Sequence, residues 1–205
     1  LPGAAQPWLA WLADRGHHLR DAEHALITEP HRSAELSQSA FLTDHLVGWI
    51  DRQDEPWFAH ASYLRPHPPY AAAGRWASEY TPDDMPTPMP VGENLHGIHR
   101  GLLAHPQSAA PTDPAKMARW QAQYFGMCSE VDDQLGRVWE ALRRAGQWND
   151  TIVIVTADHG EHFAKIGGAH RAGQHVAQHH PAFIGRLPDL TGNRSAHGAG
   201  IGACA

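Results

Sequence analysis

One stretch of the sequence decides the fold class: Thr151-Ile152-Val153-Ile154-Val155-Thr156-Ala157, followed at once by Asp158-His159-Gly160-Glu161. The first seven residues form a continuous β-branched run, without the alternation of a half-exposed strand. Such a run is typical of a parallel strand that helices cover on both faces. We therefore predict a buried strand over 151–157, with polar residues at its carboxyl end.

The segment before this strand predicts a long helix. Asp113 and Pro114 supply an N-cap and a first-turn proline, and Gly146 stands where a C-terminal cap is expected. Because one face is apolar throughout, we expect that face to be core. The apolar residues that recur every three or four positions are Met117, Trp120, Tyr124, Cys128, Val131, Leu135, Val138 and Leu142.

The opposite face of this predicted helix carries charges at i,i+4 spacing. Asp133 precedes Arg137, and Glu140 precedes Arg144. We expect two solvated ion pairs there, each worth about 0.3 kcal/mol. A helix that leads into a buried strand predicts an α/β fold in which helices cover a sheet.

Shorter elements are predicted upstream. A short apolar helix is expected from Trp8 to Arg15, and a core-facing helix from Ser39 to Asp51, with Ser37 or Ser39 as its N-cap. The aromatic-rich run from Pro56 to Leu64 predicts a buried strand. Prolines dominate from Arg65 to Pro114, which predicts a long excursion rather than a helix or a central strand.

The composition favours a folded domain with small-molecule chemistry. Of the 205 residues 42% are hydrophobic, and eight are Trp, so the chain can bury a sizeable core. The formal net charge is -6 and Lys and Arg do not cluster, whereas nucleic acid and anionic membranes attract concentrated positive charge. We expect a small-molecule partner and neither a nucleic acid nor a membrane; the oligomeric state stays open.

The cysteines and the first residues bear on the cellular compartment in which the protein is found. Cys128 and Cys204 give neither a disulfide framework nor paired-thiolate metal spacing. The opening residues lack a basic-then-apolar leader pattern. We expect a cytoplasmic location. A periplasmic or secreted one stays open, because the chain does not begin with Met and an upstream segment is expected to be missing.

The chemistry is expected at Asp158 and His159. Ligand sites in open α/β sheets lie beyond the carboxyl ends of strands, which is where this pair falls. A carboxylate oxygen with an imidazole nitrogen suits Ca²⁺, Mn²⁺ or Zn²⁺, and Gly160 permits a sharp backbone turn beside them. On pattern alone, a strand-end Asx turn with an incidental histidine is an equal alternative.

Five motifs follow one another in order along the chain: Tyr63–Tyr70, Tyr80–Pro86, Tyr124–Arg137, Trp148–Thr151 and Thr156–Glu161. Together they resemble the sulfatase branch of the alkaline phosphatase superfamily. The first two, which contain prolines, are similar in particular to the bacterial phosphonate monoester hydrolase and phosphodiesterase subgroup. The resemblance covers about Trp8 to Glu161.

The resemblance implies an alkaline-phosphatase-like α/β/α sandwich and a metal-dependent hydrolase of sulfate esters, phosphonate monoesters or phosphodiesters. A divalent cation would position a formylglycine nucleophile and stabilise oxyanion charge. By position, Asp158 and His159 match metal ligands, and His67 matches the histidine that contacts the anionic group or leaving oxygen of the substrate. Lys165 is carried over as a catalytic residue, although it stands closer to His159 than the lysine of the family does.

The chain also departs from the family. The nucleophile motif, Cys-x-Pro-x-Arg or Ser-x-Pro-x-Arg, does not occur in it, and Cys128 does not fit that motif. Asp158 and His159 alone are too few protein ligands for a closed cation site. We therefore expect residues 1–164 to be the C-terminal part of a sulfatase-like catalytic domain and the fragment to be inactive.

From Lys165 onward the composition changes. Residues 165–205 hold one acidic residue, eight glycines and five histidines. We expect an irregular tail that is disordered or frame-shifted. The alternatives to a hydrolase are a pseudoenzyme remnant and a non-catalytic metal-binding protein. The second would use tail histidines, which are His170, His175, His179 and His180.

Overall fold

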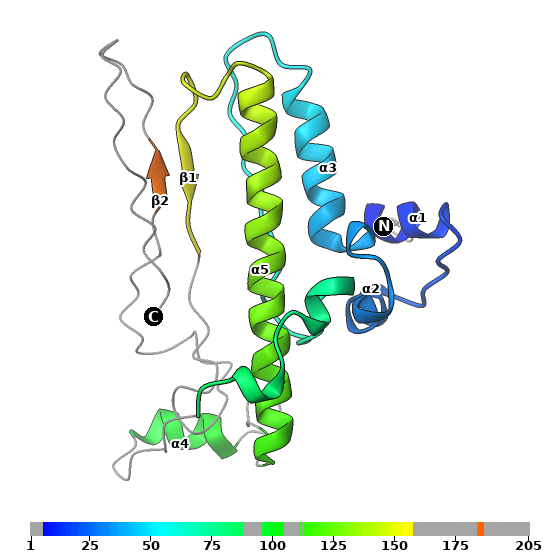
Figure 1. The fold of residues 1–205 in the computed structure, drawn as a ribbon, viewed down its shortest axis with the longest axis vertical. Coiled ribbons are helices and arrows are strands. Elements are labelled where there is room, and N and C mark those ends of the chain that lie inside the picture. The colour runs from blue at the N-terminus through cyan, green and yellow to red at the C-terminus, as the bar shows by residue number, and fades with distance from the viewer. Residues whose placement is uncertain (1–5, 88–95, 105–110, 112, 158–183, 187–205) are drawn as a thin grey trace. The chain divides into compact units, whose positions relative to one another are not determined.

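The computed structural model describes residues 6–87, 96–104, 111, 113–157 and 184–186, and Figure 1 shows its elements. The chain divides into two compact units, residues 1–85 with 118–145 and residues 86–117 with 146–205. The elements in chain order are α1 (Pro7–Ala13), α2 (Ala22–Ile27), η1 (Glu29–His31), η2 (Ala34–Leu36), α3 (Gln38–Ile50), η3 (Gly74–Ser78), η4 (Pro82–Asp84), α4 (Gly97–Ala104), α5 (Pro114–Arg144), β1 (Val153–Val155) and β2 (Ile184–Arg186).

The first two helices enclose a small apolar core. Trp8 and Leu12 of α1 pack with Ala25 and Leu26 of α2, and all four are buried. The indole Nε1 of Trp8 donates to the carbonyl of Leu36 at 3.1 Å, which satisfies the polar atom of a buried aromatic side chain. This cluster confirms the predicted short helix, which ends at Ala13.

Helix α3 begins where the sequence predicts it. The hydroxyl of Ser37 accepts a hydrogen bond from the amide of Ala40 at 3.0 Å, so Ser37 rather than Ser39 is the N-cap. The buried residues of α3 include Thr43 and Ile50. The predicted core-facing helix over 39–51 is thereby confirmed.

Helix α5 is the longest element of the described chain. It has 31 residues, and the carboxylate of Asp113 accepts from the amide of Ala115 at 3.0 Å at its start. Gly146, just beyond its end, has φ +70°, a conformation that glycine adopts without strain. The predicted helix and both end signals are confirmed. Its buried apolar residues are Met117, Ala122, Met127, Ala141 and Leu142.

Helices α3 and α5 run alongside each other, as Figure 1 shows. Arg144 of α5 contacts both carboxylate oxygens of Asp51 at 3.0 Å, and Arg137 pairs with Asp44. The two acids are seven residues apart, as are the two arginines, so the helices run parallel in matched register.

These contacts correct the predicted i,i+4 pairs. Arg137 and Arg144 reach across to α3 instead of pairing along their own helix, and Asp133 pairs with Arg75 at 3.4 Å. Glu140 pairs with Arg143, three residues along. The sequence pattern failed here because carboxylates on a neighbouring helix compete for the same guanidinium groups.

The run from Pro56 to Leu64 is not a strand. It has no regular structure, and Phe58 is 88% exposed. Two of its aromatic side chains pack on α3 instead: the ring of Trp57 lies edge-on to that of Trp49, and the hydroxyl of Tyr63 lies 2.8 Å from that of Thr43. Contact with a helix therefore takes the place of strand pairing, and the predicted buried strand is wrong.

In the second unit, β1 is shorter and differently paired than predicted. It pairs antiparallel with β2, with Val153 opposite Arg186. Ile152 and Ile154 are 56% and 59% exposed, so the run over 151–157 is not a parallel strand covered on both faces. Within the described residues β1 has one strand partner, and burial of both faces of a strand requires further neighbours.

The proline-rich region forms an excursion, as predicted, but it contains short helices. These are η3, η4 and α4, of which α4 spans Gly97–Ala104 and contradicts the expectation of no helix. Across the described parts of the chain, no helix combines the length and the apolar character that crossing a bilayer requires.

Candidate functional site

The structure describes one of the four predicted site residues. His67 lies in the loop between Arg65 and Ala71 of the first unit. Asp158, His159 and Lys165 lie outside the described residues, which stop at Ala157 after β1. The assignment of these three residues therefore stays a prediction.

His67 presents its imidazole to solvent. Its Nδ1 lies 2.7 Å from the carbonyl oxygen of Pro68, and because a carbonyl can only accept, Nδ1 carries the proton. Nε2 is then the nitrogen left for a ligand. The amide of His67 donates to the carbonyl of Leu64 at 3.0 Å, which closes a turn beneath the side chain. The residue is exposed, with a defined tautomer and a fixed backbone.

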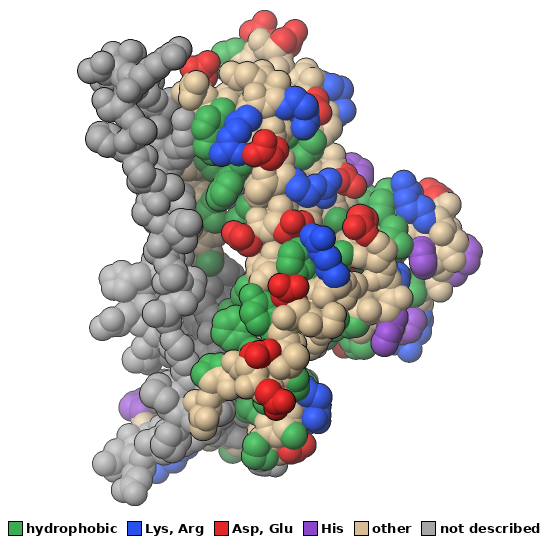
Figure 2. Space-filling model, viewed as in Figure 1, with side chains coloured by type: hydrophobic (Ala, Val, Ile, Leu, Met, Phe, Trp, Pro, Cys, Tyr) green, Lys and Arg blue, Asp and Glu red, His purple; other side chains and the backbone are tan. Residues whose placement is uncertain are grey.

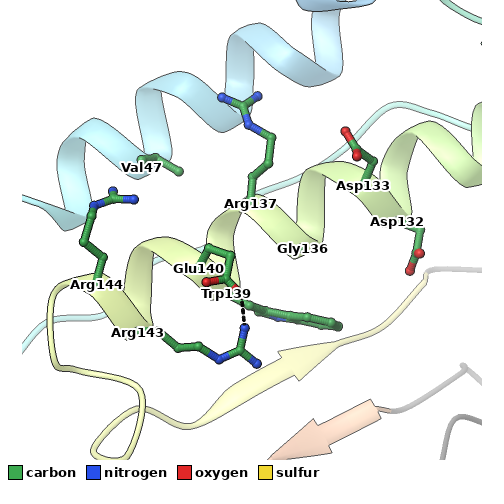
Figure 3. Close-up of a pocket in the computed structure, with 9 residues that line it drawn as sticks. All are labelled: Val47, Asp132, Asp133, Gly136, Arg137, Trp139, Glu140, Arg143 and Arg144. Carbon is green, nitrogen blue, oxygen red and sulfur yellow. Dashed lines mark hydrogen bonds and ion pairs between the residues drawn. The ribbon is translucent and has the colours of Figure 1, made fainter. Parts of the chain in front are cut away.

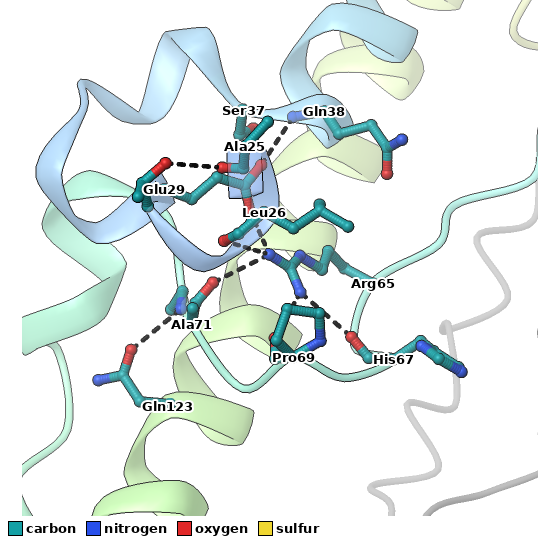
Figure 4. Close-up of polar contacts among 12 residues, drawn as sticks. Ala25, Leu26, Glu29, Ser37, Gln38, Arg65, His67, Pro69, Ala71 and Gln123 are labelled. Atoms are coloured by element: carbon teal, nitrogen blue, oxygen red, sulfur yellow. Dashed lines mark hydrogen bonds and ion pairs between the residues drawn. The ribbon is translucent and has the colours of Figure 1, made fainter. Parts of the chain in front are cut away.

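Arg65 holds the backbone of this loop from inside. Its guanidinium donates to the carbonyls of His67 at 3.1 Å and Pro69 at 2.7 Å through Nη1, and to that of Ala71 at 3.0 Å through Nη2. Nη2 also donates to the carbonyl of Leu26 at 3.3 Å. Figure 4 shows the guanidinium amid these acceptors, while the imidazole of His67 points away from it.

Two buried carboxyl groups surround this guanidinium. Glu29 of η1 pairs with Arg65, and these side chains are 1% and 0% exposed. The second oxygen of Glu29 accepts from the amide of Gln38 at 3.0 Å. Glu130 of α5 is also fully buried.

The surroundings of Glu130 shift the pKa of its carboxyl group upward. Burial raises the pKa of Glu130, and the charge of Glu29 raises it further; Arg65 and the hydroxyls of Ser37 and Ser39 oppose these effects. Neither oxygen of Glu130 has a hydrogen bond of normal geometry within the described part of the chain. A neutral carboxyl costs far less to bury than a carboxylate, which is the physical reason why burial raises this pKa.

The loop after His67 is fastened to α5. The side chain of Gln123 accepts from the amide of Ala72 at 3.0 Å and donates to the carbonyl of Ala77 at 2.8 Å. The ring of Tyr70 packs on that of Trp120. Helix α5 therefore supports the segment that carries the candidate site.

A shallow groove of about 590 Å³ lies elsewhere on the first unit, along α3 and α5. Figure 3 shows arginines at its rim, yet Arg137, Arg143 and Arg144 each pair with a carboxylate. Acidic and basic side chains are interspersed over the described surface in Figure 2. No predicted site residue lines the groove, so it offers no independent support for an anionic ligand. Its lining residues are Val47, Asp132, Asp133, Gly136, Arg137, Trp139, Glu140, Arg143 and Arg144.

Sequence reasoning missed Arg65 and its acidic neighbours. One signal was available: Pro66, Pro68 and Pro69 have no backbone N–H, so the loop lacks donors for its own carbonyls. An arginine beside such a run is placed to supply them. Glu29 could not have been found this way, because it lies 36 residues from Arg65 in the sequence.

The donor chemistry of Asp158 and His159 fits a divalent cation, but two ligands do not close a site. Among the described residues, no three His, Cys, Asp or Glu side chains are grouped to bind one.

Comparison with known proteins identifies the family. The model of the sulfatase family matches residues 6–188, which is most of the chain. The chain belongs to the sulfatase family. This confirms the resemblance carried by the motifs between Tyr63 and Glu161.

Individual relatives of this sulfatase-family chain agree. It is 32% identical to the multifunctional alkaline phosphatase superfamily protein PehA of Trinickia caryophylli, over 84% of this chain and 39% of PehA. It is 24% identical to an arylsulfatase of Clostridium perfringens, over 62% of this chain and 27% of that protein. The phosphonate monoester hydrolase of Agrobacterium radiobacter superposes with a TM-score of 0.66 at 34% identity, over 78% of this chain and 37% of that one.

These matches bear on the fold of this sulfatase-family chain, on how much of its relatives it spans and on the cofactors of its family. Its structural neighbours have the alkaline-phosphatase-like sulfatase fold, although its own described residues are mostly helical with one short strand pair. It spans less than two fifths of the length of PehA and of the phosphonate monoester hydrolase. Sulfatase-family members typically use a divalent metal ion and formylglycine.

Proposed function

We propose that this chain is part of a metal-dependent hydrolase whose substrate is a small anionic ester: a sulfate ester, a phosphonate monoester or a phosphodiester. The observation that carries the proposal is the exposed imidazole of His67, held on a loop with a protonated Nδ1 and an available Nε2. Family membership supplies the reaction class. The site, rather than the fold alone, then points to the kind of group that is bound.

His67 is proposed to contact the anionic group or the leaving oxygen. With Nδ1 donating to Pro68, Nε2 is the nitrogen that faces the ligand, and in the imidazolium form Nε2 also carries a proton and donates a hydrogen bond to an oxygen anion. A charge-assisted hydrogen bond of this kind is stronger than a neutral one. It strengthens as negative charge develops on the leaving oxygen, which favours the transition state over the ground state.

Asp158 and His159 are proposed to hold the divalent cation together with ligands from outside the described residues. When bound, the cation supplies Lewis-acid stabilisation of oxyanion charge. Lys165 is proposed to add a positive charge near the same group. These assignments rest on the family match and on the position of the pair two residues after Thr156.

No residue of this chain matches the formylglycine motif of the family. We therefore derive no nucleophilic step from these 205 residues and propose that hydrolysis requires a nucleophile supplied from outside them. On its own this chain is proposed to bind a metal ion weakly and not to hydrolyse esters. The strand β1 and helix α5 are proposed to contribute to an α/β/α sandwich once the remaining strands are present.

Titration calorimetry with Mn²⁺, Ca²⁺ and Zn²⁺ tests the metal assignment. Asp158→Ala is expected to abolish binding by the 205-residue chain, whereas deletion of residues 166–205 is expected to preserve it. Asp150→Ala, an exposed acid before β1, is the matched control and is expected to have no effect. Loss of binding only on deletion of the tail would overturn the proposal and favour a non-catalytic site made by the tail histidines.

A further inference from the structure

The loop that carries His67 has too few backbone N–H donors for its carbonyl groups. Three of its residues, Pro66, Pro68 and Pro69, have no N–H, so its carbonyls cannot all be satisfied by local backbone bonds. The carbonyls of His67, Pro69 and Ala71 accept from the side chain of Arg65 instead. One guanidinium thereby fixes the backbone from His67 to Ala71.

The planar shape of the guanidinium matters for this arrangement. Nη1 bridges the carbonyls of His67 and Pro69, while Nη2 reaches Ala71 together with Leu26 and Glu29. A lysine has three donors on a single nitrogen and cannot reach both groups of acceptors, which lie around two separate nitrogens of the guanidinium. The contacts therefore depend on arginine and not only on a positive charge.

Glu29 keeps the guanidinium in place. Both side chains are essentially withdrawn from solvent, and the second oxygen of Glu29 is tied to the amide of Gln38 at the start of α3. Loss of either partner alone would leave an uncompensated buried charge. The loop is thus linked through Arg65 and Glu29 to η1 and α3, elements remote from it in sequence.

We infer that Arg65 is a positioning residue for His67: its buried guanidinium, held by Glu29, sets the backbone from which the imidazole meets the anionic substrate. This inference rests on the proposed function for the role of His67, but the positioning itself is a property of the loop. Arg65 does not touch the substrate, because its side chain is fully buried and its Nη1 and Nη2 donors are directed at protein acceptors.

The test compares three variants of the 205-residue chain by NMR. Arg65→Lys keeps the charge opposite Glu29 but loses the fork of donors. The double variant Glu29→Met with Arg65→Met removes both buried charges together, which avoids the unpaired charge of a single substitution. Arg144→Met, which removes an exposed ion pair on α5, is the matched control.

Two readouts report on His67 and on the loop that follows it. The first is amide hydrogen exchange at His67 and Ala72, and the second is the ¹⁵N spectrum of the imidazole, which reports the Nδ1–H tautomer. In both Arg65 variants we expect exchange at His67 to rise by about tenfold or more and the tautomer preference to be lost, while α1 and α2 keep their protection. The Arg144→Met variant is expected to match the unmodified chain.

Two outcomes separate the inference from the function on which it rests. If the imidazole spectrum and the exchange of His67 are unchanged in Arg65→Lys and in the double variant, Arg65 does not position His67. Titration of the unmodified chain with inorganic phosphate is the second arm: a shift of the imidazole resonances is expected. A response of the loop to Arg65 substitution without any response to phosphate would support positioning while contradicting the proposed ligand.

Discussion

Glu130 on α5 and Glu29 on η1 are both buried, and they lie close enough for the charge of Glu29 to raise the pKa of Glu130. Burial is the main cause of the raised pKa of Glu130, while Arg65 and the hydroxyls of Ser37 and Ser39 partly offset the rise. The guanidinium of Arg65 thus acts on two carboxyl groups: it forms an ion pair with Glu29 and opposes the rise in the pKa of Glu130.

This cluster predicts a pH dependence of stability. The folded state holds the proton of Glu130 more tightly than the unfolded state does. At a pH below the ordinary carboxyl range both states are protonated, so Glu130 imposes no penalty. As the pH rises from that range through the raised pKa, the unfolded state ionises first and the free energy of unfolding falls.

Glu130→Gln is expected to abolish this fall in the free energy of unfolding with rising pH. The glutamine amide has nearly the same shape as the carboxyl group of Glu130 and does not ionise. Urea unfolding between pH 4 and 8 should show the variant gaining stability relative to the unmodified chain as the pH rises. Asp132→Asn, on an exposed position of the same helix, is the matched control and should leave the pH profile unchanged. A constant difference between Glu130→Gln and the unmodified chain at all pH values would show that Glu130 does not titrate in this range.

Two glycines of α5 are expected to respond in opposite ways to alanine. A Cβ at Gly126 would meet the carbonyl oxygen of Trp76 well inside van der Waals distance and the Cβ of Ala72 at 3.0 Å. Overpacking of this kind costs about 1–3 kcal/mol. At Gly136 a Cβ meets nothing within 4 Å, so the gain in helix propensity, up to about 1 kcal/mol, should appear undiminished.

Thermal and urea unfolding measure both substitutions. Gly126→Ala should lower the free energy of unfolding and loosen the segment after His67, and Gly136→Ala should raise it. Equal effects of the two substitutions would mean that α5 does not pack against residues 72–76 as closely as the structure indicates.

The exposed ion pair between Asp51 and Arg144 is expected to contribute little. Both oxygens lie 3.0 Å from the guanidinium, yet the two side chains are 42% and 58% exposed, so solvent screens the attraction. A double-mutant cycle with Asp51→Ala and Arg144→Ala should give a coupling of about 0.2–1 kcal/mol. The coupling should shrink in 1 M salt; a larger, salt-independent value would indicate an interaction beyond this pair.

Structural features whose causes lie within a few residues of one another could be predicted from the sequence. Helices α3 and α5 follow from spacing, capping and terminal glycine, all of which act within a few residues, and both were predicted nearly to their ends. The partners of Arg137 and Arg144 lie 93 residues away, so a rule based on i,i+4 spacing could not find them.

The wrongly predicted strands and the missed residues of the site have causes that lie far apart in the sequence. Strand formation needs pairing partners, and the aromatic run over 56–64 has helix α3 beside it instead. The role of His67 was predicted from the family resemblance of the stretch Tyr63–Tyr70 and stays a prediction, whereas the buried pair of Arg65 and Glu29 joins segments 36 residues apart. The metal ligands Asp158 and His159 were predicted from their place after a strand and stay predictions.

The last prediction concerns catalysis by a polypeptide that joins these residues to a nucleophile-bearing segment. There, His67→Ala should lower kcat/KM for an aryl sulfate or a phosphonate monoester by about 10²–10⁴-fold, the usual contribution of a positioned proton donor. The metal content should not change, because His67 is not among the proposed ligands. His60→Ala, at another exposed histidine of the first unit, is the matched control and should retain activity. Turnover unaffected by His67→Ala would refute its role, whereas loss of bound metal in that variant would reassign His67 to the metal site.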